Sequence, residues 1–496
     1  MAILKAPYNF VPLSQKVVYP VWADKISLDI PFADEKSGII TVKVEAVTPI
    51  YVRNGYKAID KEQMPAFKRT EEFQSFSKSP DNVYFIPATT IKGELRHTLK
   101  IASFGKFNPI NSKEYKVGKE GDRDVKKTMT QFVPLQHKRN DYDMAECIFG
   151  KVTKTDSLKG RVHISHAFCT EEKGFEPTIA PYMGSPKPTY YPIYLEQKGK
   201  EDAFGEVNTY RTYMGTSSKL RGWKMYPARN EWKNDFPSVN EKQLDNLNPS
   251  TPLAKGSQFL FTIRYHNLKK VELGALLYAL CPAESSCHSI GFAKPFGYGV
   301  CKYTICYTES FTSEMADDAK REFVEYMEEQ LHSEVDFEHS PQIKELVAMM
   351  NPDLGTEDML LEYMSLEDYK AVKQHDPAND IYGQYLPPYS ELVEFTLEQS
   401  DEKNQPDTEQ PEAQEVITPP TPLPQVSDEI LAKVTFSQKQ GNNVIVSFVI
   451  EEGDKKGRKD KVNVPINVNT KNIKWNKLKQ IKVEYKNGKY LFKKTL

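Results

Sequence analysis

The order of periodic segments in the first 310 residues limits the fold more than any other feature of this chain. Alternating apolar and polar residues predict strands at 38–52, 160–168, 257–266 and 300–308. Apolar residues at helical spacing predict helices at 90–103 and 268–281. The order strand, helix, strand, strand, helix, strand is that of a ferredoxin-like α+β core. Large insertions interrupt it at about residues 104–159 and 170–256, and their Lys, Tyr, Pro and Gly predict irregular lobes.

Two basic segments that contain glycine lie within this pattern. The first, Tyr84 to Arg96, has the features of a strand, a turn and a helix, and the second, Gly291 to Gly299, is a glycine-rich loop. Small residues let main-chain N–H groups approach phosphates, and Lys or Arg neutralises them. We therefore expect a polyanion to bind here. The residues proposed for this contact are Lys92, Gly93, Arg96, Gly291, Lys294, Gly297, Tyr298 and Gly299.

Both segments also have a purely structural interpretation. Lys92, Arg96 and Lys100 recur four apart, one position after the apolar stripe of the same helix. An ordinary amphipathic helix shows the same pattern, and the helix taken alone favours that interpretation. Phe292, Phe296 and Tyr298 alternate with small residues, so they either stack on splayed bases or belong to the core.

The net charge of −2 conceals a strong asymmetry along the chain. Residues 1–310 hold 44 Lys and Arg against 33 Asp and Glu, a net charge of +11. Residues 311–428 carry a net −23, and residues 429–496 carry a net +10. Two basic modules separated by an acidic one favour a nucleic-acid partner. Basic domains that bind nothing specific are also common, so the alternative stays open.

Composition also bears on cell compartment and metal chemistry. No segment resembles a secretory signal or a transmembrane span, and six cysteines without an evident disulfide framework suit a reducing cytosol. We therefore expect a cytoplasmic protein with no membrane partner. The cysteines lack CxxC pairs, and His163 and His166 are expected on opposite faces of a strand, so no metal site is predicted.

Beyond residue 310 the chain changes character three times. Residues 311–399 predict a small acidic helical region, with helices at 315–331 and 342–350. Residues 400–428 are rich in Pro, Gln, Glu and Thr and predict a disordered linker. Residues 429–496 predict a basic domain of five strands that suits a small β-barrel. Its Lys455, Lys456, Arg458 and Lys459 form a basic loop, which favours RNA binding slightly over simple protection of edge strands.

Several short motifs together resemble the RAMP superfamily of CRISPR-associated proteins, over about residues 5–308. They are Ala6 to Pro12, Thr48 to Val52, Ile86-Pro87 through Arg96, Phe149-Gly150 with Gly160 to Val162, Leu220 to Tyr226, Thr251 to Gly256, and Gly291 to Gly299. The resemblance implies a core like that of RNA-recognition motifs that binds CRISPR RNA, as in backbone subunits of type III effector complexes. Within the segment Leu220 to Tyr226, Arg221 and Lys224 are further candidates for RNA contact.

Catalysis is a separate question. Some type III backbone subunits cut target RNA with an acidic residue in the loop after the first strand, and here the first such residue is Asp60. Others in the superfamily process precursor RNA with a His as general base, and His97 follows Arg96 on the predicted binding helix. A solvated loop Asp and a structural His are the alternatives for these two residues. No cofactor is implied, although RNA cleavage through Asp60 would use a divalent cation.

The sequence thus predicts a non-enzymatic subunit of an antiviral, type III-like effector that binds CRISPR RNA, with target RNA and other effector subunits as further partners. A second hypothesis is an endoribonuclease of the same superfamily. A third is a structural adaptor that recruits partners through its acidic helices and its C-terminal domain.

Overall fold

A computed structural model of the 496-residue chain shows two compact units, Met1–Pro406 and Asp407–Leu496. The residues that the structure describes are 4–55, 59–107, 113–154, 156–185, 187–197, 210–236, 244, 246–332, 336–354, 361–373, 386–393, 429–440, 443–450, 459–465, 480–486 and 489–495. The predicted linker, 400–428, lies outside these residues.

The first unit is built on a curled antiparallel sheet of seven strands. Its strand order is β12-β13-β2-β11-β9-β3, and β8 also pairs with β11. The strands are β12 (Cys287–Ser289), β13 (Val300–Cys306), β2 (Lys36–Ala46), β11 (Gln258–Leu268), β9 (Ala167–Glu171), β3 (Phe85–Ile86) and β8 (Val162–Ile164). Alternation along β11 buries Phe259, Phe261 and Ile263 on one face and exposes Arg264 on the other, so one face of the sheet is apolar.

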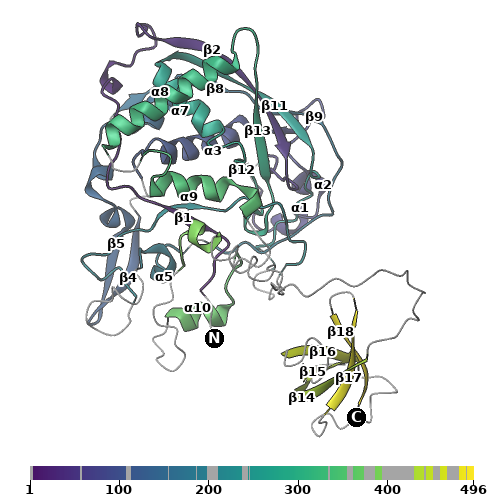
Figure 1. The fold of residues 1–496 in the computed structure, drawn as a ribbon. Helices are drawn as coiled ribbons and strands as arrows, with labels where there is room; N and C mark the ends of the chain where they lie inside the picture. Colours follow the sequence, from purple (N-terminus) through teal and green to yellow (C-terminus); the bar gives the residue numbers. More distant parts are fainter. Residues whose placement is uncertain are drawn as a thin grey trace, which may run out of the picture. The chain divides into compact units, whose positions relative to one another are not determined.

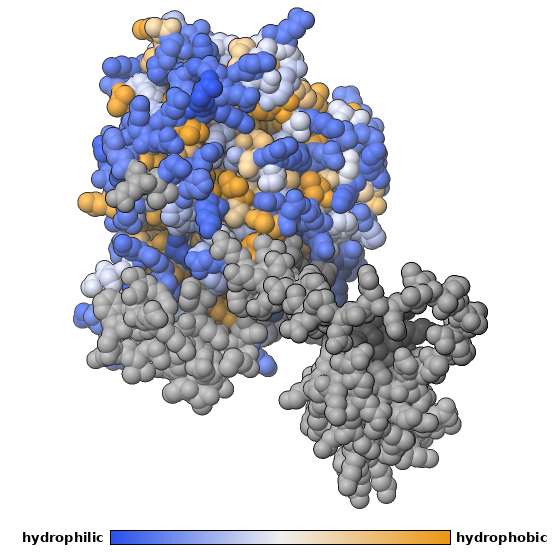
Figure 2. Space-filling view, viewed as in Figure 1, coloured by the Kyte–Doolittle hydropathy of each residue, from blue (hydrophilic) through white to orange (hydrophobic). Residues whose placement is uncertain are grey.

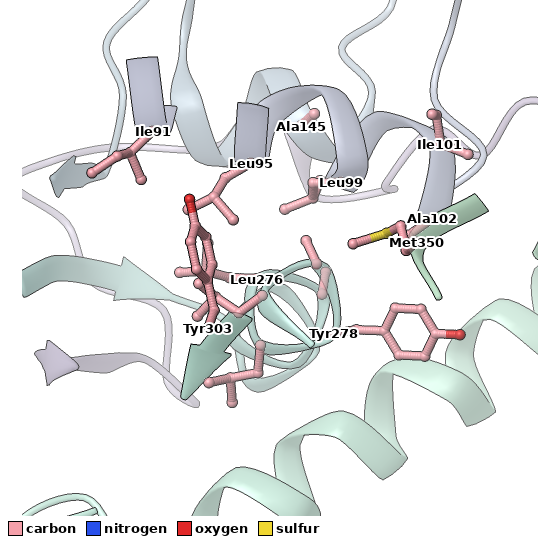
Figure 3. Packing of buried hydrophobic residues seen from close by; sticks show 14 of the residues in the cluster. Ile91, Leu95, Leu99, Ile101, Ala102, Ala145, Leu276, Tyr278, Tyr303 and Met350 are labelled. Atoms are coloured by element: carbon pink, nitrogen blue, oxygen red, sulfur yellow. The ribbon is translucent and has the colours of Figure 1, made fainter. Parts of the chain in front are cut away.

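Helices pack on the apolar face of this sheet. The helices α3 (Ala88–Ala102), α7 (Lys270–Leu280), α8 (Ser313–Leu331) and α9 (Pro341–Met350) share one hydrophobic core with the strands (Figure 1). Ile91, Leu95 and Leu99 are fully buried, as their spacing predicts. Figure 3 shows these three side chains directed from α3 toward Leu276 of α7 and Tyr303 of β13. The mixed α+β class is therefore confirmed.

Two predicted strands differ from those in the structure: one ends earlier than predicted, and the other is divided in two. The strand predicted at 38–52 stops at Ala46, where the pairing becomes irregular: Val47 N and Thr48 N both donate to Val300 O, at 2.8 Å and 3.2 Å. The strand predicted at 160–168 is two strands, β8 and β9. Between them Ser165 Oγ accepts a hydrogen bond from Thr262 N at 2.9 Å, and this side chain takes the place of a ladder partner.

The insertions contain more regular structure than the sequence suggests. The first holds a hairpin of β4 (Glu114–Glu120) and β5 (Arg123–Thr128), and in the second β10 (Gly222–Met225) pairs with β1 (Asn9–Pro12). The remaining short elements are α1 (Met64–Phe67), α2 (Glu71–Gln74), α4 (Met144–Phe149), α5 (Tyr191–Tyr194), α10 (Leu366–Lys373), β6 (Lys151–Val152), β7 (Ser157–Leu158), and the 3₁₀ turns η1 (Ala23–Lys25), η2 (Met129–Phe132), η3 (Leu135–Lys138), η5 (Lys294–Phe296) and η6 (Pro352–Leu354).

The acidic helices belong to the first unit. Ala319 and Phe323 of α8 are buried in the same cluster as the sheet, and Phe323 lies 5.5 Å from the ring of Tyr278 on α7. Charged residues cover the outer side of α8, and Lys270 of α7 pairs with Asp318 at 2.6 Å. Figure 2 shows a mainly hydrophilic surface with apolar residues interspersed on this side of the unit. Deletion of residues 311–399 would therefore open the core of the first unit.

The second unit contains a five-stranded antiparallel sheet. Its order is β16-β15-β14-β17-β18, formed by β14 (Glu429–Gln440), β15 (Asn443–Ile450), β16 (Lys459–Pro465), β17 (Gln480–Lys486) and β18 (Lys489–Thr495). The predicted strands of this module are thus present, but closure into a barrel is not among the strand pairings of its described residues. The predicted turn at Asn487-Gly488 and the loop residues Lys455, Lys456 and Arg458 lie outside the described residues.

A fully buried ion pair joins three elements of the first unit. Arg161 donates to Glu272 in the first turn of α7, to Asn267 O near the end of β11 and to Cys147 O on α4. Both side chains of the pair have no exposed surface. Glu272 also accepts from Trp22 Nε1 at 3.2 Å, so the buried charges are well supplied with hydrogen bonds.

Among the described residues, none of the helices combines the length and apolar character needed to cross a membrane.

We predict that Arg161→Ala lowers the free energy of unfolding of the first unit by about 3–5 kcal/mol, because it leaves the Glu272 carboxylate buried and uncompensated. Urea denaturation followed by tryptophan fluorescence measures this loss. Arg321→Ala is the control, since Arg321 pairs with Asp318 at 2.7 Å on the exposed side of α8, where water screens the pair and its loss should barely change the stability. Equal losses in the two variants would contradict the structural role of Arg161.

Candidate functional site

The two glycine-bearing segments meet at one pocket in the first unit. Its volume is about 410 Å³, and it is formed by α3, β10, β12 with the loop that follows, and the end of α9. The predicted site residues Gly93, His97, Lys224, Gly291 and Lys294 all line it. A larger pocket of about 630 Å³ exists in the same unit, but it contains only Arg221 of the predicted set. The smaller pocket is therefore the candidate site, and we refer to it as the α3 pocket.

A carboxylate and an imidazole pair at the wall of the α3 pocket. Glu94 Oε1 lies 2.7 Å from His288 Nδ1 and accepts a hydrogen bond from Thr98 Oγ1 at 2.9 Å. His288 Nε2 lies 2.9 Å from Leu280 O at the end of α7, and the ring stacks on Tyr303. Burial alone would lower the pKa of His288, but the adjacent Glu94 outweighs it and raises the pKa. This pair is best described as two opposite charges that compensate each other.

The contact between Glu94 and His288 is an ion pair without an aligned hydrogen bond. Within the described structure, neither His288 Nδ1 nor Glu94 Oε2 has a hydrogen-bonding partner. Burial alone would raise the pKa of Glu94, but His288 outweighs it and lowers the pKa. Glu94 is therefore an anion whose charge is directed to His288.

His97 lies one turn further along α3 and is predominantly neutral. Its ring packs edge-on against Trp223 with centroids 5.6 Å apart. Burial lowers the pKa of His97 to about 4, which outweighs the opposing effect of Glu94. At neutral pH, therefore, this ring adds no charge to the α3 pocket.

Lys224 enters the α3 pocket from β10 between tyrosine rings. Its Nζ lies 3.7 Å from the ring centroid of Tyr8 and 5.4 Å from that of Tyr226, and it donates to Tyr194 Oη at 3.2 Å. Burial lowers the pKa of Lys224 to about 8. Lys224 is consequently still mostly cationic at pH 7, in a half-buried position among tyrosine rings.

Lys294 supplies the second cation of the α3 pocket. It begins the turn η5, and the preceding Ala293 has a left-handed backbone with φ of 60°. Burial lowers the pKa of Lys294, and the charge of Glu94 opposes this shift. The two lysines come from segments about 70 residues apart, and the fold brings both to one cavity.

The glycines of the second segment hold the backbone of the loop. Gly291, Gly297 and Gly299 all have positive φ, between 78° and 85°. A Cβ on Gly297 would lie 2.1 Å from Glu231 O, and one on Gly299 would lie 1.9 Å from Ile290 O. Gly93 differs, because a Cβ there meets nothing within 4 Å. Of the predicted glycines, Gly93 therefore leaves room for a ligand, whereas the other three shape the loop that carries Lys294.

The aromatic residues of this loop pack inward. Tyr298 is fully buried and donates to Asn234 Oδ1 at 2.6 Å, and Phe296 is 6% exposed. Phe292 is partly buried, with its ring 6.1 Å from that of Tyr51. The structure places Tyr298 in a packing role, and base stacking would require its ring to leave the core.

The cationic stripe on α3 is only partly available. Lys100 pairs with the buried Asp143 at 3.3 Å. Lys92 lies 6.0 Å from the ring of Phe149, and burial together with the neighbouring Arg96 lowers the pKa of Lys92. Lys92 and Arg96 are half-buried and lie beside the α3 pocket in sequence without lining it. Their role in RNA contact stays a prediction.

Arg221 stabilises the chain rather than facing the α3 pocket. Its Nη2 donates to Leu386 O and to Pro387 O, the latter at 2.9 Å, and its guanidinium lies 5.6 Å from the ring of Phe10. These bonds attach the segment at 386–393 to β10.

The two predicted catalytic residues, Asp60 and His97, lie in different surroundings. Asp60 is exposed, and its main-chain oxygen accepts from Gln63 N and Met64 N at 3.0 Å before α1. It does not line the α3 pocket, whereas His97 does. The described part of the chain contains no cluster of three or more His, Cys, Asp or Glu side chains that could hold a metal ion.

Sequence reasoning missed three kinds of residue at this site. Glu94 lies inside the segment from Tyr84 to Arg96, but only the cations and glycines of that segment match a polyanion site. His288 lies three residues before Gly291 and had no motif of its own. Met349 and Met350 of α9 also line the α3 pocket, and no local pattern connects them with residues 250 positions earlier.

The chain belongs to the RAMP superfamily. The model of this family matches residues 43–302, more than half of the chain. This range contains α3, Lys224, the glycine-rich loop and Lys294, but not α9.

Comparison with solved structures finds matches at low sequence identity and low TM-score. A chain of a "Type IV-B CRISPR Complex" is 11% identical, with a TM-score of 0.27, over 55% of this chain and 92% of that one. A chain in the "Cryo-EM structure of the Type III-B Cmr-beta bound to cognate target RNA" is 15% identical, with a TM-score of 0.26, over 57% and 70% respectively. Both TM-scores are low, so these likenesses carry no functional weight. No curated protein matches the sequence.

The glycines provide a test of this division of roles. We predict that Gly93→Ala raises the free energy of unfolding by about 0.5–1 kcal/mol, because Ala is favoured over Gly inside a helix and the added methyl group meets no atom. Gly297→Ala should lower it, because the residue is strained at a φ of 85° and clashes with Glu231 O. Thermal denaturation of both variants measures the two effects, and a destabilised Gly93→Ala variant would contradict the open space at Gly93.

Proposed function

We propose that this protein binds CRISPR RNA through the α3 pocket and the adjoining surface of α3, as a subunit of a type III-like antiviral effector complex. The observation that carries the proposal is the convergence of Gly93, Lys224 and Lys294, from three motifs, on one cavity of a RAMP-superfamily chain. Cations next to small residues suit a phosphodiester backbone. Other effector subunits, and target RNA paired with the guide, are the expected partners.

The strand order of the central sheet supports this interpretation. Taking the four strands of the predicted core in chain order as β2, β8 with β9, β11 and β13, their order across the sheet is fourth, first, third, second. All of their pairings are antiparallel. We interpret this as a ferredoxin-like core of the kind used in RNA-recognition motifs, with β12 and β3 added at its edges.

The electrostatics of the α3 pocket favour an anion. Glu94 and His288 compensate each other, and His97 is neutral near pH 7. Lys224 and Lys294 therefore give the cavity a net positive charge. A cation in a site with little water interacts with a phosphate more strongly than one at the surface. This supports phosphate binding at the two lysines.

A second candidate is metal-independent cleavage of RNA with His97 as general base. Its place in the α3 pocket, which Lys224 and Lys294 also line, favours this candidate over Asp60. However, a base with a pKa of about 4 is poorly matched to proton abstraction near pH 7. We therefore favour binding without cleavage, and a denaturing gel of RNA incubated with the protein distinguishes the two. The third hypothesis, a structural adaptor that recruits partners through its acidic helices, is tested by charge reversal on the outer face of α8. Deletion of residues 311–399 is unsuitable, because it would open the core of the first unit.

The direct test of the proposed function is purification from the native host with sequencing of the bound RNA. Discrete RNAs that carry CRISPR repeat sequence are the expected result. Absence of RNA, or random fragments that are removed by salt, would contradict guide binding.

We predict that Lys294→Gln weakens RNA binding and reduces its salt dependence. Loss of one phosphate contact lowers the slope of log K against log salt by about 0.7 for a single strand. Fluorescence anisotropy of a labelled single-stranded RNA at several salt concentrations measures the slope. Arg321→Gln on α8 removes an equal charge from an exposed acidic helix and should leave the slope unchanged. The same slope in Lys294→Gln as in the unmodified protein would show that Lys294 contacts no phosphate.

The lowered pKa of Lys224 predicts a pH dependence. A phosphate binds the ammonium form, and with a pKa of about 8 that form is mostly lost at pH 9. RNA affinity should therefore be about tenfold lower at pH 9 than at pH 7, if bound phosphate restores an ordinary lysine pKa. An adenosine oligonucleotide is the suitable probe, since its bases do not titrate in this range. Lys224→Met should bind more weakly at pH 7 and show little further loss at pH 9. Equal affinity of the unmodified protein at both pH values would exclude Lys224 from the interface.

A further inference from the structure

The face of the central sheet that is turned away from the helices, here called the open face, carries a cluster of three rings. Phe85 of β3, His166 between β8 and β9, and Phe168 of β9 form this ring cluster. The ring centroid of Phe85 lies 4.8 Å from that of His166 and 5.9 Å from that of Phe168. Phe168 is 44% exposed, His166 is exposed, and Phe85 is half-buried. The ring cluster therefore presents aromatic surface that a ligand can reach.

Strand pairing fixes the position of the ring cluster on the sheet. Phe85 lies opposite Phe168, and Phe168 lies opposite Leu260 of β11, which is 40% exposed. Leu260 in turn lies opposite Lys43 of β2. Residues that face each other across neighbouring strands point to the same side of a sheet. These four side chains therefore form one row across the open face, with the aromatic rings at the end next to the edge strand β3.

A hydrogen bond connects the ring cluster with helix α3. Ala88 N, in the first turn of α3, donates to His166 Nδ1 at 3.1 Å. The neutral imidazole therefore carries its proton on Nε2, where it is a donor for a base or a phosphate. Thr90 and Gly93 of the same helix line the α3 pocket. Because Gly93 is only about 7.5 Å from Ala88 along the helix axis, a single strand at the α3 pocket can continue round the edge at β3 to the ring cluster.

We infer that the ring cluster stacks on bases of the same RNA strand whose phosphates bind at the α3 pocket. The inference rests on the proposed function and adds a contact to the bases. Stacking of a base on an aromatic side chain requires no particular sequence, because every base has a π-face. The strand is thus held by its backbone on one side of β3 and by its bases on the other.

The polar residues around the ring cluster favour a nucleic acid over an apolar protein partner. Arg264 of β11 is exposed on the open face, opposite His163 of β8. Glu45 and Glu171 lie toward the other end of this face, and each forms an ion pair with a neighbouring lysine. An apolar partner would remove water from Arg264 without replacing its hydrogen bonds. Phosphate oxygens accept hydrogen bonds from a guanidinium, so an RNA strand avoids this cost.

The test compares two phenylalanines of equal exposure in the full-length protein. Phe168→Ser removes a ring of the cluster, whereas Phe175→Ser removes a ring that is also 44% exposed but packs on Tyr84, with centroids 5.4 Å apart. Fluorescence anisotropy with a twelve-nucleotide adenosine RNA should show an affinity about tenfold lower for Phe168→Ser and unchanged for Phe175→Ser. Phe168→Tyr keeps the ring and should bind as the unmodified protein does.

An RNA of the same length without bases separates stacking from contact with the backbone. On this abasic strand Phe168→Ser and the unmodified protein should bind equally, whereas Lys294→Gln should weaken binding to both strands. If Phe168→Ser lacks the thermal transition of the unmodified protein, photocrosslinking of the unmodified protein decides alone. A strand that contains 5-iodouridine should then crosslink to the peptides that hold Phe85 or Phe168.

Each other outcome overturns the inference. A folded Phe168→Ser variant that binds the adenosine RNA as tightly as the unmodified protein does, or crosslinks that lie only elsewhere, would exclude stacking at the ring cluster. The open face would then be left to a protein partner, and the proposed function would stand. An equal loss for Phe168→Ser on the abasic strand would show that Phe168 does not act through the bases. RNA that does not bind the unmodified protein at all would contradict the proposed function itself.

Discussion

The buried pair of Arg161 and Glu272 is the interaction on which the architecture of the first unit depends. Arg161 stands at the start of β8, and its guanidinium contacts α4, the end of β11 and the first turn of α7. A charge without exposed surface is tolerated only when all these partners are in place, so the four elements must assemble together. The position of α7 then determines the pocket, because Leu280, eight residues or about 12 Å further along this helix than Glu272, accepts a hydrogen bond from the ring of His288. The motif from Gly160 to Val162, which is part of the family resemblance, thus has a structural explanation that does not involve RNA.

The candidate site follows the same rule, that a buried charge needs a compensating partner. Glu94 and His288 lie in the wall of the cavity, but they form an ion pair. Their opposite charges compensate each other, so the pair adds no net charge to the cavity. His97 avoids the cost of burial by losing its proton. What remains is the positive charge of two lysines, each with a lowered pKa, in a cavity with an apolar wall. Glu94, His288 and His97 together therefore add no net charge to the α3 pocket, and its positive charge comes from the two lysines.

Local sequence patterns predicted what local physics controls. The burial of Ile91, Leu95 and Leu99, and the helices that became α3, α7, α8 and α9, follow from apolar periodicity alone. The errors arise where the backbone leaves regular pairing, as Val47 N and Thr48 N share one acceptor after β2, and as Ser165 divides β8 from β9. Five of the proposed residues do line one pocket, but the sequence had no means to show that Tyr298 faces Asn234 or that Arg221 binds the carbonyl oxygens at 386 and 387. Those partners are between 64 and 166 residues away in the chain, so no spacing rule relates them.

The region beyond residue 310 shows why charge and burial must be considered together. The net charge of −23 over residues 311–428 argues against contact of this region with RNA, yet Met349 and Met350 of α9 line the α3 pocket. Both properties are compatible on an amphipathic helix, because the buried face and the exposed face serve different partners. The acidic outer face of α8 repels a phosphate backbone, while the cations of α3 and η5 attract it. This distribution of charge supports the proposed approach of an RNA strand to the lysines of the pocket, while the acidic helices stabilise the first unit through the apolar residues that they bury.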